Sequence, residues 1–342
     1  MRLQCPVKPS GGVRLRLKLS RKSHIRRRYT KLDKEYVSAS APNKRGDTVG
    51  TGGTATVRVM YRKGHPEKGR FAVKVFDRFP DEMRTDYEDR VWEEVKMANC
   101  LDHENLLRTF GVRRIRDTLC CIMEYCSAGD FFDYIESRPQ IDNTRPLLRQ
   151  LLLGVKHMHD RGIAHRDIKP ENTLLASQQC LKLCDFGTAI AFREKITAVT
   201  SNAGSGNIYD KASAGVGTKE YQPPEVAAKD NRCYDPIKWD VWSLGLTFFN
   251  AVTASHPWER ANAGDQRYVL YLQAWDTFLS DNKDRSVTET EYPYCVVEGF
   301  LRLEDSALRT LILRMLHPDP AKRITVNDAL NDPWFQDINS CA

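Results

Sequence analysis

The chain has 342 residues, of which 41% are hydrophobic and 28% are charged, a composition typical of globular proteins. This length suits one large domain or two lobes that share a cleft. No apolar run approaches the roughly 18 residues of a membrane-spanning helix, and Arg and Lys interrupt the N-terminus, so we expect neither a membrane span nor a signal peptide. The ten cysteines lack regular paired spacing, which indicates a reducing compartment and no cysteine zinc site.

The formal net charge of +7 is concentrated near the N-terminus, because residues 1–34 hold twelve Lys and Arg and a single acid, Asp33. We expect residues 1–45 to form a solvated arm, mostly without regular structure, although 13–19 alternate apolar and basic residues as a short strand does. The sequence leaves several functions for this arm open. They are contact with acidic lipid or protein surfaces, a localisation signal, a pseudosubstrate-like segment in an acidic cleft and, least expected, contact with nucleic acid.

A hairpin is predicted at residues 49–60, where a strand ends in small residues and a β-rich run restarts at once. Its glycines, Gly50 and Gly52, would allow backbone N–H groups to approach an anion closely. The next strand is expected at 71–76 and carries one charge, Lys74, in an apolar run. Because it follows a glycine hairpin, we expect this lysine to face a cleft and not the solvent.

A helix is predicted at residues 83–100, where apolar residues recur at helical spacing. Glu93 and Glu94 on this helix are both candidates to position Lys74. The predicted buried stripe consists of Tyr87, Val91, Val95 and Ala98.

A second buried strand is expected at 120–126, and it runs into a hinge ending at Asp130, a candidate helix N-cap. A core helix should follow, because apolar residues again recur at helical spacing: Leu148, Leu151, Leu152, Val155 and Met158. Residues 239–252, 308–316 and 324–330 are also expected to be helical. We assign no role to the mixed-charge segment 259–300.

Residues 164–172, with the sequence Ala-His-Arg-Asp-Ile-Lys-Pro-Glu-Asn, are followed shortly by Asp185-Phe186-Gly187. Together these segments supply a candidate base, Asp167, and a cation, Lys169. They also supply two oxygen donors, Asn172 and Asp185, of the kind that Mg²⁺ prefers.

In this order, the motifs resemble the eukaryotic protein kinase family over about residues 45–336. Further motifs support the resemblance: Gly217-Thr218-Lys219-Glu220-Tyr221-Gln222-Pro223-Pro224-Glu225, then Asp240-Val241-Trp242-Ser243-Leu244-Gly245, then Arg323. The resemblance implies an α+β, two-lobed fold, with a small β-rich N-lobe carrying one regulatory helix and a larger, mainly helical C-lobe. The implied parts are the arm at 1–45, the N-lobe at 46–123, the hinge at 124–130, the C-lobe at 131–336 and a short tail at 337–342. The chain departs from the family pattern at Ala55, which replaces the third glycine of the hairpin, and at Pro223.

The resemblance implies a phosphotransferase that uses ATP and Mg²⁺. Asp167 would orient the acceptor hydroxyl and accept its proton, while Lys169 would place positive charge near the γ-phosphate. Asn172 and Asp185 would bind Mg²⁺. His165 is implied to be a packing residue.

The resemblance also implies how the nucleotide is held. Lys74 would bind the α- and β-phosphates, and Glu94 is the better candidate for its partner because it lies nine residues before His103, the usual spacing in the family. The glycines Gly50 and Gly52 would cover the phosphates. The implied adenine and ribose pocket consists of Val57, Ala72 and Leu174 around the ring, Met123 behind it, the backbone of Glu124 and Cys126 at its edge, and Asp130 near the ribose or a basic substrate side chain.

Lys169 and Thr218 are typical of the Ser/Thr class, and Thr218 is expected to bond Asp167 and Lys169. Glu225 is expected to form a buried ion pair with Arg323. The alternative to an active enzyme is an ATP-binding pseudokinase that acts as a scaffold. Arg166 is implied to pair with a phosphate on the long activation segment, for which the candidate acceptors are Ser213, Thr200 and Ser205; a segment without a phosphosite is the alternative.

Several segments also resemble fungal kinases that regulate permeases and ion transport, the halotolerance type. They are the hinge Met-Glu-Tyr-Cys, the run from Tyr234 to Ser243, and Pro257-Trp258. This resemblance implies protein substrates in nutrient or ion transport signalling. The expected localisation is cytoplasmic, with membrane-peripheral or nuclear placement as alternatives.

Overall fold

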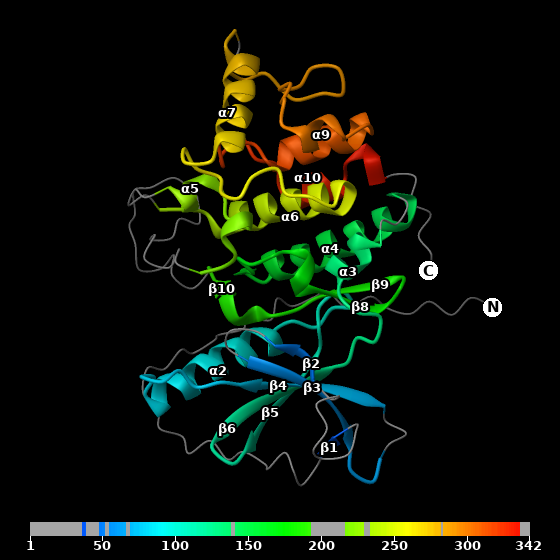
Figure 1. Ribbon diagram of the computed structural model, residues 1–342, viewed down its shortest axis with the longest axis vertical. Helices are drawn as coiled ribbons and strands as arrows, with labels where there is room; N and C mark the ends of the chain where they lie inside the picture. The colour runs from blue at the N-terminus through cyan, green and yellow to red at the C-terminus, as the bar shows by residue number, and fades with distance from the viewer. Residues whose placement is uncertain are drawn as a thin grey trace, which may run out of the picture.

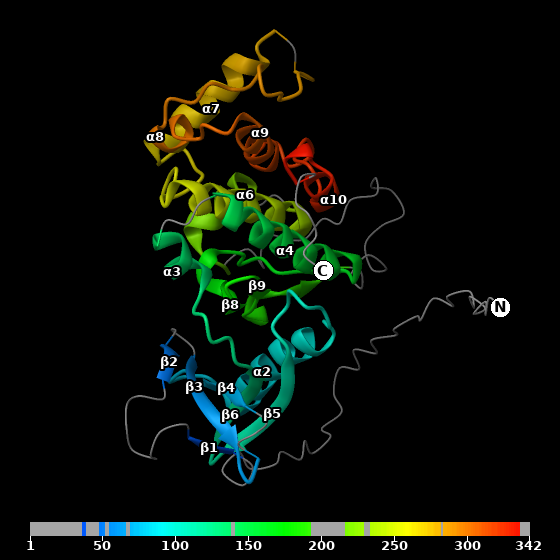
Figure 2. The ribbon, with the colours of Figure 1, turned by 90° about the vertical axis from the view of Figure 1, so that its right-hand side faces the viewer.

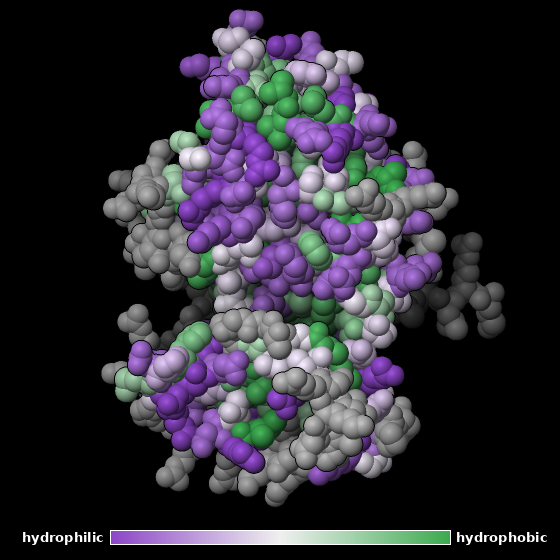
Figure 3. All heavy atoms as spheres, viewed as in Figure 1, coloured by the Kyte–Doolittle hydropathy of each residue, from purple (hydrophilic) through white to green (hydrophobic). Residues whose placement is uncertain are grey.

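The computed structural model describes residues 36–38, 48–51, 55–65, 69–137, 141–192, 216–228, 233–281 and 283–335. They form a small lobe built on a sheet and a larger helical lobe (Figure 1). The space-filling view shows a constriction between the two lobes (Figure 3). The expected α+β, two-lobed architecture is therefore confirmed.

The N-lobe contains one antiparallel sheet in the order β1-β3-β4-β6-β5, with β2 also paired to β3. Its strands are β1 Tyr36–Ser38, β2 Thr48–Thr51, β3 Ala55–Arg62, β4 Arg70–Phe76, β5 Thr109–Ile115 and β6 Thr118–Glu124. β-branched, aromatic and cysteine side chains fill both faces of the central strands, which is why β4 and β6 are the predicted apolar runs.

The strand β1 lies inside the range that we expected to be an arm. It pairs with β3, with Tyr36 opposite Arg62, and Tyr36 is buried. The sheet therefore begins before residue 46, which corrects that part of the predicted boundary. The rest of the arm lies outside the described residues, so its extent stays a prediction.

Helix α2, Arg84–Asn99, packs on one face of this sheet (Figure 2). Its buried residues are Tyr87, Val91, Val95 and Ala98, the predicted stripe. The Tyr87 hydroxyl also links two strands, because it donates to the Phe76 carbonyl and accepts the Leu119 N–H at 2.7 Å.

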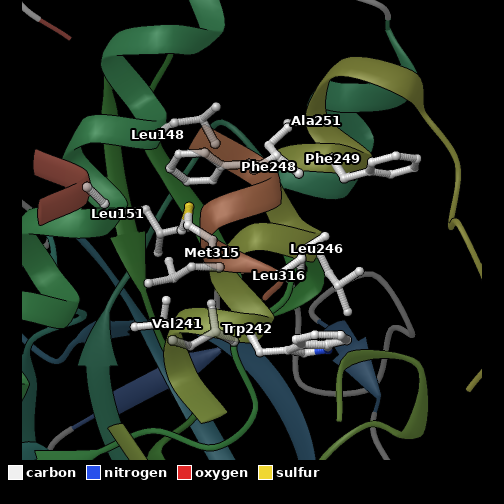
Figure 4. Packing of buried hydrophobic residues seen from close by; sticks show 14 of the residues in the cluster. Leu148, Leu151, Val241, Trp242, Leu246, Phe248, Phe249, Ala251, Met315 and Leu316 are labelled. Carbon is white, nitrogen blue, oxygen red and sulfur yellow. The ribbon is translucent and has the colours of Figure 1, made fainter. Parts of the chain in front are cut away.

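The C-lobe helices are α3 Phe131–Glu136, α4 Ile141–Asp160, α5 Pro224–Ala227, α6 Pro236–Thr253, α7 Gln266–Leu279, α8 Glu298–Leu301, α9 Ser306–Met315 and α10 Val326–Leu330. The C-lobe also contains two short antiparallel pairs: β7 Ile163–Ala164 with β10 Ile190–Ala191, and β8 Thr173–Ser177 with β9 Cys180–Leu183. The large core lies where α4, α6 and α9 meet, and Figure 4 shows Leu148 and Leu151 facing residues of α6 and α9. The five apolar residues predicted on α4 are all buried.

The segment 259–300 has more structure than the sequence suggested. It contains α7, which buries Tyr268, Tyr271, Trp275 and Phe278. In the parts of the chain that the structure describes, no helix combines the length and apolar character needed to cross a membrane.

Candidate active site

A cavity of about 810 Å³ lies between the lobes. Its walls include most of the predicted site residues: Gly50, Val57, Ala72, Lys74, Glu94, Met123, Glu124, Cys126, Asp130, Asp167, Lys169, Asn172, Leu174 and Asp185. Thr218 is not part of the lining but contacts two residues that are. Gly52 lies outside the described residues.

The β2–β3 hairpin forms part of the N-lobe wall of this cavity. Gly50 lies opposite Val57 in the strand register, and both residues line the cavity. Ala55, at the position where the family has its third glycine, begins β3 and is buried. An alanine therefore fits here as part of the core of the lobe.

Lys74 projects from β4 into the cavity and bridges two carboxylates from different elements. Its Nζ lies 2.7 Å from Oε1 of Glu94 on α2 and 2.9 Å from Oδ1 of Asp185. Glu94 was thus the correct choice, and Glu93 is exposed. The contact joins the helix of the small lobe to the Asp185 motif of the large lobe.

Burial and charge compete within this ion-pair group. Burial alone would lower the pKa of Lys74, but Asp185 and Glu94 raise it on balance. Burial raises the pKa of Glu94 despite the attraction of Lys74. Burial also acts to raise the pKa of Asp185, but Lys74 overcomes this effect and lowers it, so Asp185 is an anion at neutral pH.

Asp167 is held by neighbours on both sides. Its Oδ1 accepts the backbone N–H of Thr218 at 2.7 Å, and its Oδ2 accepts Nδ2 of Asn172 at 2.8 Å. Lys169 Nζ lies 3.7 Å from Oδ2 of Asp167 and donates to the Thr218 hydroxyl at 2.6 Å. The predicted contacts of Thr218 with Asp167 and Lys169 are therefore present.

His165 belongs to the same segment as Asp167, residues 164–172, and its side chain is fully buried. The ring accepts the Asp167 N–H at Nδ1 and faces the Cys184 carbonyl through Nε2 at 2.9 Å. A carbonyl can only accept, so Nε2 is the donor toward Cys184 while Nδ1 is the acceptor. It packs edge-on against Phe186, in agreement with the expected packing role.

Asp240, on α6, holds the backbone of the catalytic loop, residues 164–172, which carries Asp167. Its motif in the sequence, residues 240–245, indicates no individual role for it. Its side chain is completely buried and accepts the backbone N–H groups of His165 and Arg166, together with His159 Nε2. A fully buried carboxylate requires such donors. The sequence signal for it is an acid whose neighbours Trp239, Val241 and Trp242 are large apolar residues.

The donors available for a metal ion fit Mg²⁺. No cluster of three or more His, Cys, Asp or Glu suited to a metal occurs among the described residues. Asn172 uses its amide nitrogen toward Asp167, which leaves the amide oxygen available. The Asp185 side chain is 46% exposed. One amide and one carboxylate oxygen suit Mg²⁺, which takes its other ligands from phosphates and water.

The hinge side of the cavity matches the predicted adenine pocket in part. Among the described residues, the N–H and C=O of Cys126 form no hydrogen bond with another backbone group. The Glu124 side chain pairs with Lys182 at 3.2 Å, away from the backbone edge. Asp130 caps α3 by accepting the Asp133 N–H at 2.8 Å, so its predicted N-cap role is confirmed.

Two features connect the site to the remainder of the C-lobe. Glu225 and Arg323 form the predicted buried pair, with contacts of 2.8 and 3.1 Å. Arg166 donates to the Thr188 carbonyl and to the Tyr234 hydroxyl at 2.9 Å. The candidate phosphate acceptors Ser213, Thr200 and Ser205 lie outside the described residues, so their role stays a prediction.

A cleft between a sheet lobe and a helical lobe, with Lys74, Glu94, Asp167 and Asp185 on its walls, is the active-site architecture of a phosphotransferase. Residues 44–335 match the protein kinase domain family, and the chain belongs to this family.

The chain is similar to curated protein kinases, two of which below are named serine/threonine-protein kinases. The chain is 30% identical to the serine/threonine-protein kinase hal4 of Schizosaccharomyces pombe, covering 91% of this chain and 46% of that protein. It is 29% identical to the serine/threonine-protein kinase HAL4/SAT4 of Saccharomyces cerevisiae, with 86% and 46% covered. It is 31% identical to the CBL-interacting protein kinase 30 of Oryza sativa subsp. japonica, with 86% and 54% covered. The chain thus spans about half the length of these relatives, and the expected resemblance to the fungal group is confirmed.

Proposed function

We propose that this protein is a serine/threonine protein kinase that transfers the γ-phosphoryl group of ATP to hydroxyl groups of proteins. The observation that carries the proposal is the arrangement of Asp167. Its carboxylate is fixed by Thr218 and Asn172 at the wall of a cavity that also holds the Lys74–Glu94 pair.

Asp167 would act on the acceptor hydroxyl. Both of its oxygens already have donors, so the carboxylate cannot rotate freely, and it would hold the hydroxyl in line with the γ-phosphate and accept its proton. Lys169, 3.7 Å away, would stabilise negative charge on the transferred group.

Lys74 would bind the α- and β-phosphates, and Glu94 would fix its position. Asn172 and Asp185 would hold Mg²⁺, which supplies charge neutralisation of the phosphate oxygens. The hinge backbone at Glu124 and Cys126 would bond the adenine edge, with Val57, Ala72 and Leu174 around the ring, Met123 behind it and Asp130 near the ribose. Gly50 and Gly52 would cover the phosphates.

The Lys169–Thr218 contact supports hydroxyl acceptors of the Ser/Thr type, because it places this lysine beside Asp167. Protein substrates in nutrient or ion transport signalling are proposed from the likeness to the fungal relatives. For the basic arm we propose contact with acidic lipid or protein surfaces, which would give a cytoplasmic protein a membrane-peripheral location.

Transfer of labelled γ-phosphate to a generic basic protein tests the proposal. The variant Asp167→Asn should lower kcat by about 10²–10⁴-fold, while Asp142→Asn, an exposed acid elsewhere in the lobe, should not. Phosphoamino-acid analysis should find phosphoserine or phosphothreonine. Equal transfer by wild type and Asp167→Asn would contradict the proposal, and nucleotide binding without transfer by the wild type would favour a scaffold.

A further inference from the structure

Arginine residues are frequent in the strands of the N-lobe sheet. The strands β2, β3, β4 and β5 contain no acid, and their arginines are Arg58, Arg62, Arg70, Arg113 and Arg114. Helix α2, on one face of the sheet, carries five acids: Asp86, Glu88, Asp89, Glu93 and Glu94. The helix also carries Arg84, Arg90 and Lys96, and Arg114 of β5 pairs with Glu88 of the helix at 3.0 Å. The strand arginines other than Arg114 are therefore the source of positive charge on the sheet away from α2.

A row of aromatic rings crosses the sheet face opposite α2. The rings of Tyr36 and Phe71 lie 5.5 Å apart, and those of Phe71 and Phe110 lie 5.6 Å apart, both edge-on. Tyr36 belongs to β1, Phe71 to β4 and Phe110 to β5, so the row extends from the first strand of the sheet order to the last.

A cation lies at each end of this row. Arg62 is exposed and pairs across the strands with Tyr36. At the other end, the guanidinium of exposed Arg108 lies 5.7 Å from the centre of the Phe110 ring. Phe110 itself is 46% exposed, unlike most large apolar side chains of a folded domain. We name these five residues, Arg62, Tyr36, Phe71, Phe110 and Arg108, the aromatic–basic strip.

The basic N-terminal segment enters the fold at one end of this strip. Tyr36 lies two residues after the segment 1–34, which holds twelve Lys and Arg and one acid. Within that segment, residues 13–19 alternate Val or Leu with Arg or Lys. Pairing of β1 with β3 places Tyr36, two positions after this strongly cationic and partly apolar sequence, at one end of the strip.

We propose that the aromatic–basic strip binds the anionic headgroups of a lipid bilayer. Arginines beside an exposed aromatic ring suit the membrane interface, where phosphates meet the first carbons of the acyl chains. A single-stranded nucleic acid would use aromatic rings for base stacking. Arg108 already lies over the Phe110 ring, and the alternating Leu residues of 13–19 have no counterpart in phosphate recognition. The proposal does not depend on kinase activity.

The test uses the full chain and phosphatidylcholine vesicles with and without about 30 mol% phosphatidylserine. We expect sedimentation of the wild type only with the anionic vesicles, and release by added salt. Arg108→Gln should weaken binding about fivefold, the effect of one cation near such a surface, and Phe110→Ser should weaken it several-fold. The matched variant Arg84→Gln removes an exposed cation from the acidic helix face and should bind as the wild type does.

Unchanged thermal unfolding of Arg108→Gln would show that the variant is folded, since its side chain is exposed. The proposal is overturned by wild-type binding that does not require the anionic lipid, or by Arg108→Gln and Arg84→Gln weakening binding equally. A single-stranded oligonucleotide whose binding is lost in Arg108→Gln while vesicle binding is kept would also overturn it, in favour of nucleic acid.

Discussion

The carboxylate of Asp240 accepts the backbone N–H of Arg166 at 2.7 Å, although the two residues are 74 positions apart in the chain. Arg166 has a φ of 66°, in the left-handed region that costs a residue with a Cβ about 1 kcal/mol or more. It directly precedes Asp167. The buried carboxylate on α6 thus stabilises an unfavourable backbone conformation immediately before the proposed base.

The first prediction concerns this contact. Asp240→Asn replaces one acceptor oxygen with a donor that faces a backbone N–H, so one buried donor loses its partner. We expect the free energy of unfolding to fall by about 1–3 kcal/mol and kcat to fall at least tenfold. Urea denaturation and steady-state kinetics measure the two effects. Asp281→Asn, at an exposed acid, is the control, and an unchanged kcat in Asp240→Asn would refute a positioning role.

The second prediction compares two glycines with similar backbone angles. Gly217 has a φ of 77°, and a Cβ there would lie 2.5 Å from the Arg166 carbonyl oxygen. Gly69 has a φ of 80°, but a Cβ there would meet nothing within 4 Å. Both alanine variants should lose about 1 kcal/mol of stability through backbone strain. Only Gly217→Ala should also displace the catalytic loop and lower kcat/KM more than tenfold. Equal kinetic effects of the two substitutions would show that strain, and not contact with the loop, is responsible.

Local patterns in the sequence predicted the parts of the fold that depend on periodicity. The α2 stripe follows from helical spacing. The choice of Glu94 came from the family resemblance, through its spacing of nine residues from His103, and its contact with Lys74 agrees with that choice. The family resemblance located Asp167, Asn172 and Asp185, and their clustering in one cavity agrees with it.

The features that were missed depend on contacts between distant segments. Tyr36 joins the sheet through pairing with β3. A three-residue strand that is stabilised by its partner has no local sequence pattern that would predict it. Asp240 acquires its role only when α6 packs under the catalytic loop. Helix α7 is an exception, because its buried aromatic residues Tyr268, Tyr271, Trp275 and Phe278 recur at helical spacing, so the sequence did contain a local signal for it.

The third prediction concerns the buried pair of Arg323 and Glu225. The Arg323 side chain is fully buried, makes two contacts with Glu225 and lies 4.9 Å from the centre of the Trp242 ring. Arg323→Met leaves a carboxylate in the interior without its cation, so we expect a loss of about 3–5 kcal/mol in the free energy of unfolding.

Two further variants test this explanation by chemical denaturation. The double variant Arg323→Met/Glu225→Gln should be more stable than Arg323→Met, because it also removes the unpaired charge. Arg302→Met breaks an exposed pair with Glu298 and should cost less than about 1 kcal/mol. A double variant no more stable than Arg323→Met would show that lost packing against Trp242, and not the buried charge, dominates.

The fourth prediction concerns the pH dependence of stability. Burial, together with Arg323 and Lys322, lowers the pKa of His317 to about 4. The ring is buried against Trp275, and its Nδ1 accepts the Asp319 N–H at 3.0 Å. In the unfolded chain the pKa is about 6.5. The depressed native pKa means that the unfolded state binds the proton first, so this contribution to stability is complete above about pH 6.5 and is lost as the pH falls toward 4.

Between pH 7 and pH 5, His317 should therefore reduce the free energy of unfolding by about 2 kcal/mol. The variant His317→Asn keeps an acceptor near the Asp319 N–H but cannot take up a proton, so its stability should fall by about 2 kcal/mol less over the same interval. Denaturant unfolding of both proteins at several pH values measures this difference, in which the contributions of all other groups cancel. Parallel pH curves for the two proteins would mean that His317 does not stay neutral in the folded state.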